Sequence, residues 1–233
     1  MRKLLTGLMK YRRDELPQRR AMFKKLADEG QSPDVLFIAC SDSRIDPNLL
    51  VSGEPGDLFM LRTIGNLIAP SDATGAAVGD VSEAAAIEYS LVVLGVRDIV
   101  VCGHSHCGAM KAVLGGKETL SGVPHLVEWL DHGVPSLDRV KRAKYIDHSL
   151  PLVEQLSQVN VLQQLDHVRS YPLVREREAK GEVHLHGWWF DVATGDTQIF
   201  DRDRGGFVTI DDELAERSAA HELSAPQLAF DED

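Results

Sequence analysis

Short apolar runs separated by turn-forming residues mark the first half of the chain. Three of them, residues 35–39, 58–61 and 99–102, are bounded by Gly, Pro or Asp and are too short to be buried helices. Between the second and the third run, residues 79–94 carry apolar side chains at helical spacing, and Gly95 supplies a stop. A strand, a helix and a strand in this order predict parallel strands joined by a helical crossover.

The rest of the chain continues this alternation of patterns. Residues 4–28 place apolar side chains among charged ones, which predicts one or two amphipathic helices interrupted near Pro17. Residues 122–180 are rich in helix-forming residues, and residues 182–192 and 197–200 have the composition of two further strands. Four prolines that suit first helical turns divide the helical region: Pro124, Pro135, Pro151 and Pro172.

These patterns favour an α/β fold with a central, mostly parallel β-sheet flanked by helices. An N-terminal helical arm precedes the sheet, and a helical segment precedes the last strands. We divide the chain into the arm at residues 1–30, a central domain at residues 31–210 and an acidic tail at residues 211–233. The tail could bind a partner or simply fray in solvent, and we favour fraying.

Composition and charge narrow the range of functions. Of the 233 residues, 43% are hydrophobic and 26% are charged, and the apolar runs are shorter than the roughly 20 residues of a membrane helix. The formal net charge of −11 argues against binding to nucleic acid or to anionic lipid. The apolar stretch near the N-terminus is short and broken by Gly7, so we expect no signal peptide and a cytoplasmic protein without a membrane span.

Two segments with metal-binding chemistry follow predicted strands. Cys40 comes directly after the first run, and His104 and Cys107 follow the third. Because ligands bind outside the carboxyl ends of parallel strands, both segments should open into one site. Two thiolates and one imidazole form the ligand set of a tetrahedral zinc site whose fourth position is left for water or substrate. Cys102 lies within an apolar run and is expected to be buried.

A carboxylate and a guanidinium stand close to the first cysteine. Asp42 could occupy the fourth zinc position itself, or Arg44 could hold it away by bidentate hydrogen bonds. In the second case the carboxylate can accept a hydrogen bond from zinc-bound hydroxide and orient it toward an electrophile.

The motifs resemble one enzyme family. CSDSR at residues 40–44, RTIGN at 62–66, GHSHCGAM at 103–110 and HGWWFDV at 186–192 are similar to the beta-class carbonic anhydrases, in particular to bacterial members of the plant-type subclass. The resemblance implies reversible hydration of carbon dioxide to bicarbonate and a proton by zinc-bound hydroxide. It also implies one Zn²⁺ per chain and a homodimer or higher even oligomer with active sites near the dimer interface.

The resemblance also assigns site residues. The zinc ligands of the family fall on Cys40, His104 and Cys107, and its catalytic pair falls on Asp42 and Arg44. The substrate-binding residues that it implies are a glutamine and an apolar wall, at Gln31, Phe59, Ile64 and Tyr89. The backbone N–H of Gly108 can also hydrogen-bond a substrate oxygen.

Alternative functions use the same residues. A zinc hydrolase of carbon disulfide or carbonyl sulfide could act through the same site, because those molecules are linear electrophiles shaped like carbon dioxide. A thiol redox or metal-storage protein would use the cysteines, but Cys102 and Cys107 do not form a Cys-x-x-Cys pair, and this reading leaves Asp42 and Arg44 unexplained.

Histidines outside the motifs offer further candidates. His106 lies between two of the expected ligands and could transfer protons, although a surface or helix-capping role fits it equally. A second metal cluster could be sought among His125, His132, His148 and His167, but their spacing does not repeat as a ligand motif, and we expect exposed helix positions for them.

Overall fold

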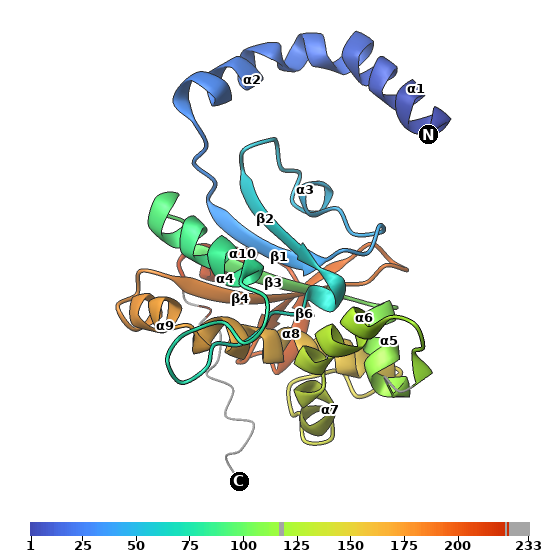
Figure 1. Cartoon of the computed structure of the whole chain (residues 1–233). Coiled ribbons are helices and arrows are strands. Elements are labelled where there is room, and N and C mark those ends of the chain that lie inside the picture. The colour runs from blue at the N-terminus through green and yellow to red at the C-terminus, as the bar shows by residue number, and fades with distance from the viewer. Residues whose placement is uncertain (117–118, 222, 224–233) are drawn as a thin grey trace.

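The computed structural model describes residues 1–116, 119–221 and 223 of the chain (Figure 1). Six strands in this part of the chain form one sheet in the order β2-β1-β3-β4-β5-β6. The strands are β1 (Val35–Cys40), β2 (Leu58–Thr63), β3 (Asp98–His104), β4 (His184–Phe190), β5 (Thr197–Asp201) and β6 (Gly206–Thr209). Neighbours from β2 to β4 pair in parallel, and β5 and β6 join antiparallel. The predicted α/β fold with a mostly parallel sheet is confirmed.

The central strands are apolar on both faces, as buried parallel strands usually are. Leu36 and Ile38 of β1 point into a cluster with helix side chains on one face of the sheet. Phe37 and Ala39 alternate with them and pack with Cys102 on the other face. Cys102 is therefore buried, as predicted.

The register brings the ends of β1 and β3 to one edge of the sheet. Ala39 lies opposite Cys102, so the chain leaves β1 after Cys40 beside the place where β3 ends at His104. The helical crossover between β2 and β3 consists of α4 (Ser82–Glu88) and the π-helical segment η3 (Tyr89–Val93).

Helices between β3 and β4 form most of the layer on one side of the sheet (Figure 1). They are α5 (Gly108–Gly115), α6 (Pro124–Trp129), the 3-10 turn η5 (Leu130–Gly133), α7 (Pro135–Val140), α8 (Leu152–Ser170) and α9 (Pro172–Ala179). The prediction of a proline-divided helical region is confirmed: three prolines lie in first turns, and Pro151 is the N-cap of α8. Helix α8 packs on β3 and β4 and has mostly buried residues, polar ones among them.

The N-terminal arm projects from the body of the molecule (Figure 1). It comprises α1 (Arg2–Lys10), the π-helical segment η1 (Tyr11–Glu15) and α2 (Leu16–Glu29), which follow one another directly. The interruption predicted near Pro17 is confirmed: the π-helical segment separates the two α-helices, and Pro17 lies in the first turn of α2, where its missing N–H leaves no hydrogen bond of that helix unmade. Arg19 of α2 pairs with Glu54 of the body at 2.9 Å.

The pattern of the sequence predicts neither β6 nor the last helix, α10 (Asp212–Ala219). Asp211 caps α10 by accepting a hydrogen bond from the Leu214 N–H at 2.8 Å, and Leu214 is fully buried against Ile199. The expectation of a frayed tail is therefore wrong for residues 212–219, where one buried leucine and an N-cap hold a helix on the sheet. Residues 222 and 224–233 of the expected tail lie outside the described residues.

Two short elements complete the description. They are the helix α3 (Pro47–Leu50) and the 3-10 turn η2 (Ile64–Asn66). Among the described residues, no helix combines the length and the apolar character needed to cross a lipid bilayer.

Candidate metal centre

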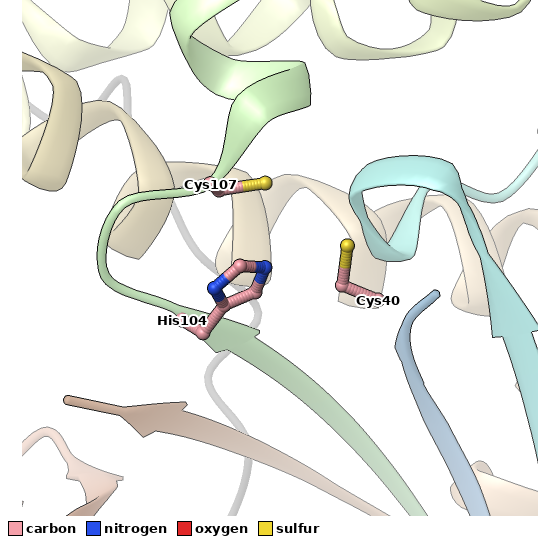
Figure 2. Close-up of side chains that lie close together, drawn as sticks. All are labelled: Cys40, His104 and Cys107. Atoms are coloured by element: carbon pink, nitrogen blue, oxygen red, sulfur yellow. The ribbon is translucent and has the colours of Figure 1, made fainter. Parts of the chain in front are cut away.

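Three side chains with soft or nitrogen donors meet at the carboxyl edge of the parallel strands (Figure 2). Cys40 ends β1, His104 ends β3, and Cys107 is the N-cap of α5. One donor atom from each lies within 4.8 Å of the other two, and all three residues are buried. The structure thus brings together the three predicted zinc ligands.

The imidazole of His104 is prepared to bind a cation. Its Nδ1 lies 2.8 Å from the Ser105 carbonyl oxygen, which can only accept, so Nδ1 carries the proton and Nε2 presents a lone pair. Nε2 is buried and lacks a hydrogen-bond partner within the described chain. A buried acceptor without a donor is costly, and a metal ion in its place removes the cost. These residues therefore fit a zinc ion.

The two thiols interact with each other and with backbone N–H groups. A hydrogen bond with the Cys107 thiol lowers the pKa of Cys40, and the same contact, together with burial, raises the pKa of Cys107. The Gly65 N–H also donates to Cys40 Sγ at 3.3 Å. Gly65 has a φ of 73°, and a Cβ there would come within 2.7 Å of the Ala109 Cβ, so this close approach requires glycine.

The carboxylate of Asp42 is held by Arg44 beside the three ligands. Arg44 donates from Nε to Oδ1 at 2.9 Å and from Nη2 to Oδ2 at 2.7 Å, and its backbone N–H donates to Oδ1 at 3.0 Å. These hydrogen bonds lower the pKa of Asp42 well below its usual range. Arg44 also donates to the His106 carbonyl oxygen at 3.0 Å, which anchors the pair to the segment that carries Cys107. Of the two arrangements that the sequence left open, the structure has the one in which Arg44 binds the carboxylate.

A cavity of about 270 Å³ adjoins this centre. Its wall includes Ile64 and Gly108 from the predicted substrate-binding set, together with Cys40 and Asp42. Most of the remaining wall is apolar and comes from α5, α6 and η5.

The other predicted substrate-binding residues lie away from this cavity within one chain. Gln31 is exposed in the segment between α2 and β1. The rings of Phe59 and Tyr89 stack on each other with centroids 5.7 Å apart, and Tyr89 lines a separate hollow of about 510 Å³. A role for these three residues in substrate binding stays a prediction.

Buried polar side chains of α8 position the centre, and the sequence analysis missed them. Ser157 Oγ donates to the His104 carbonyl oxygen at 2.7 Å, and Asn160 Nδ2 donates to the Gly65 carbonyl oxygen at 3.1 Å. Gln164 Oε1 accepts from the Ile68 N–H at 2.9 Å. Polar side chains on the face of a helix that is expected to be buried are one signal for such residues. Helical periodicity alone misses them, because it assigns polar side chains to the solvent-exposed face.

The histidines outside the motifs divide into exposed and buried positions. His125 is an exposed helix position, as predicted, whereas His148 is exposed but lies in a turn and His132 is half-buried. The prediction is wrong for His167, which is buried and shares a short Nδ1 contact of 2.7 Å with the Ile68 carbonyl oxygen. Burial lowers the pKa of His167 to about 4. His106 is exposed, and its Nδ1 lies 3.4 Å from Glu154 Oε1, so proton transfer by this residue stays a prediction.

Fold and centre together define a class of protein. A parallel α/β sheet presents two thiols and one imidazole at its carboxyl edge, beside a small cavity and a carboxylate held in place by a guanidinium. Such a three-residue ligand set leaves one coordination position for water or substrate, which is the arrangement of catalytic zinc sites.

Comparison with known proteins gives the family. The carbonic anhydrase family model matches residues 35–197. A carbonic anhydrase from Synechococcus elongatus is 41% identical over 213 residues, which cover 91% of this chain and 76% of the relative. One from Pseudomonas aeruginosa is 39% identical over 210 residues, which cover 90% of this chain and 92% of the relative. The chain belongs to the carbonic anhydrase family.

Solved structures place it in the beta class. The beta-carbonic anhydrase CcaA superposes with a TM-score of 0.80 at 38% identity and covers 93% of this chain and 96% of its own. A tetrameric beta-carbonic anhydrase from Sordaria macrospora superposes with a TM-score of 0.70 at 29% identity and covers 85% and 95%. The protein is a zinc-dependent lyase of the beta class, and the hydrolase of carbon disulfide or carbonyl sulfide is not favoured.

Proposed function

We propose that Cys40, His104 and Cys107 hold one zinc ion at which the protein hydrates carbon dioxide reversibly to bicarbonate and a proton. The observation that carries this proposal is the buried, unpartnered Nε2 of His104 beside two thiols and an open cavity. When bound, the zinc ion acts as a Lewis acid that lowers the pKa of a water molecule, which supplies hydroxide as a nucleophile.

Asp42 orients the nucleophile in this proposal. Its pKa is depressed by Arg44, so the carboxylate remains ionised and can only accept hydrogen bonds. An acceptor at this place fixes the O–H of the attacking group and turns its lone pair toward the substrate. Arg44 keeps the carboxylate oxygens in position through the two side-chain hydrogen bonds described above.

The cavity suits a small, linear, apolar substrate. Ile64, Ala109, Leu126 and Leu130 contribute apolar side chains to its wall, and these can hold carbon dioxide without competing hydrogen bonds. Gly108 opens α5, and a Cβ added to it would meet no atom within 4 Å, so the backbone is accessible there. Its N–H, at the first turn of the helix, can donate to a substrate oxygen as charge develops.

Assembly into a homodimer or a higher even oligomer completes the proposal. Gln31 and Tyr89 are exposed in the single chain and lie away from its own cavity, so they can contribute to a site only across an interface. Support for such an interface comes from the arm, where Leu4 is 72% exposed and Leu8 is 61% exposed. A cytoplasmic location agrees with three cysteines that are all free thiols.

Stopped-flow measurement of carbon dioxide hydration, with zinc content determined on the same sample, tests this function. We expect rapid hydration with about one zinc per chain. Sulfide release from carbon disulfide or carbonyl sulfide is assayed in parallel. Stoichiometric zinc with sulfide release and without hydration would replace the proposal by the hydrolase, and a chain that takes up no zinc would refute the centre itself.

A further inference from the structure

A second group of metal-ligating side chains lies at the opposite edge of the sheet. Asp98 is the first residue of β3, whereas His104 is the last. Asp98 meets His186 of β4 and His221, which follows α10. One donor atom from each lies within 4.8 Å of the other two. His186 Nε2 is 2.8 Å and His221 Nδ1 is 3.4 Å from the same Asp98 Oδ1.

These separations suit a small cation. Nitrogen and oxygen ligands about 2.0–2.1 Å from a tetrahedral metal ion lie about 3.3 Å apart. The contact of Asp98 with His221 already has this length, and the contact with His186 must widen by only about half an ångström. The ring of His221 stacks on that of His184 with centroids 3.8 Å apart and planes at 11°, which fixes the direction of its nitrogen.

The group borders a hollow of about 740 Å³ that gives an ion access from solvent. Asp98, His186 and His221 all line the hollow, and so do the charged residues Asp34 and Arg97. Two carboxylates against one guanidinium favour a cation there. The open side leaves room for water or a small ligand at the remaining coordination positions.

We propose that Asp98, His186 and His221 form a second, solvent-accessible site for a divalent transition-metal ion of the Zn²⁺ or Ni²⁺ type. Two imidazoles and one carboxylate favour such ions over Mg²⁺ and Ca²⁺, which prefer oxygen ligands throughout. The ion replaces the contacts that His186 and His221 now share with Asp98. It thereby joins the end of the α10 segment to β3 and β4, so that metal binding and the docking of this segment are coupled.

The test titrates Ni²⁺ into the zinc-loaded enzyme and follows binding by calorimetry and by visible absorption. Because zinc already occupies the centre at the carboxyl edge, the added Ni²⁺ binds only at other sites. We expect about one equivalent of Ni²⁺ to bind with d–d bands of nitrogen and oxygen ligands and without thiolate charge-transfer bands.

Three variants locate the site. His221→Gly removes the imidazole, and glycine accepts the positive φ of 56° at this position without strain. Asp98→Asn removes the charge and keeps the shape of the side chain. Both should weaken Ni²⁺ binding at least about tenfold, whereas the exposed control His148→Ala should leave it unchanged.

Two results would overturn the proposal. Binding that is equal in the wild type and in both variants would place the ion elsewhere. Absence of binding to a wild-type sample that retains its zinc would show that the three side chains form a hydrogen-bonded group only. Zinc content and the unfolding midpoint of each variant establish that it is folded, and carbon dioxide hydration plays no part in the readout.

Discussion

The two edges of the sheet present metal-ligating side chains in contrasting surroundings. At the carboxyl edge, Cys40, His104 and Cys107 are buried, and the Nε2 of His104 has no partner in the described chain. At the amino edge, His186 Nε2 and His221 Nδ1 both have Asp98 within reach, and His221 is exposed. The first group is incomplete without an ion, whereas the second is satisfied by internal contacts.

Burial explains this difference. Loops that follow parallel strands enclose a crevice at the carboxyl edge, and α8 supplies buried donors to the backbone there. At the amino edge, the described residues leave a hollow that Asp98, His186 and His221 line, so water reaches this group. At the carboxyl edge, the buried Nε2 of His104 has no hydrogen-bond partner in the described chain, so this group needs a metal ion. The group at the amino edge can exchange between its internal hydrogen bonds and a weakly held ion.

Loss of a zinc ligand should have the largest effect. In Cys40→Ser the ligand is no longer a thiolate, so we expect the zinc content to fall toward zero and hydration to fall by at least about a thousandfold. Cys102→Ala is the matched control, because Cys102 is also buried and lies on β3 without joining the ligand group. It should keep zinc and activity. Stopped-flow hydration with metal analysis checks both variants, and an active Cys40→Ser enzyme would contradict the assigned centre.

His167 should make stability at the carboxyl edge depend on pH. Its folded pKa of about 4 lies below the usual 6.5, so between these values the unfolded chain binds more protons. Its contribution to the free energy of unfolding is therefore complete above about pH 6.5 and is lost as the pH falls to about 4, by roughly 3 kcal/mol in total. Urea unfolding at pH 7.5 and pH 5 should show about 2 kcal/mol of this loss, because pH 5 lies above the folded pKa.

The matched variant for this measurement is His167→Asn. Its amide N–H can still donate to the Ile68 carbonyl oxygen, which now lies 2.7 Å from Nδ1, but the side chain does not titrate. The difference in unfolding free energy between wild type and variant should grow as the pH rises from 5 to 7.5. An identical pH dependence in the two proteins would show that the imidazole is not held neutral.

Much of the carboxyl edge could be predicted from the sequence. The apolar runs at β1, β2 and β3 are short and sharply bounded, and topology sends their carboxyl ends to one edge, so the ligand group follows from residue types at strand ends. The pairing of Asp42 with Arg44 is also local, because the two residues are separated by only one position.

Contacts between distant segments could not be predicted in this way. Asn160 lies far from Gly65 in the sequence, and only the packing of α8 on the sheet joins them. His221 reaches Asp98 only because Leu214 docks α10, a helix that the acidic composition of the tail conceals. Gln31 illustrates a further limit, because a role across an interface is invisible in one chain.

Asn160 should show how strongly α8 supports the centre. Its side chain donates to the Gly65 carbonyl oxygen and accepts from Gln164 Nε2 at 3.0 Å and from Ser136 Oγ at 3.2 Å, all in the interior. Asn160→Ala removes the partner of the Gly65 carbonyl oxygen and of Ser136 Oγ, while Gln164 Nε2 keeps the His132 carbonyl oxygen at 3.2 Å, so we expect a loss of about 2 kcal/mol in unfolding free energy. Gly65 also donates to Cys40, and zinc should therefore dissociate about ten times faster.

A chelator competition assay measures zinc dissociation in this variant, and urea unfolding measures its stability. Gln155→Ala, in the half-buried first turn of the same helix, is the control, and its loss should be below about 1 kcal/mol. Unchanged zinc dissociation in a destabilised Asn160→Ala protein would assign Asn160 to the stability of the fold alone.

The smallest effect is expected from Arg217 of α10, on the side of the amino edge. Arg217 Nη1 lies 2.8 Å from Oδ2 of the buried Asp201, and Nη2 lies 2.8 Å from Oδ2 of Asp203. In Arg217→Ala the Asp201 carboxylate keeps two partners, the Asp203 N–H and the Arg204 guanidinium at 3.8 Å. The free energy of unfolding should therefore fall by about 1 kcal/mol, and not by the several kcal/mol expected of a buried charge left without a partner. Because α10 positions His221, Ni²⁺ affinity should fall, while zinc content and hydration at the carboxyl edge should not change. A parallel fall in hydration would mean that the two edges are coupled through the sheet and would break the contrast between them.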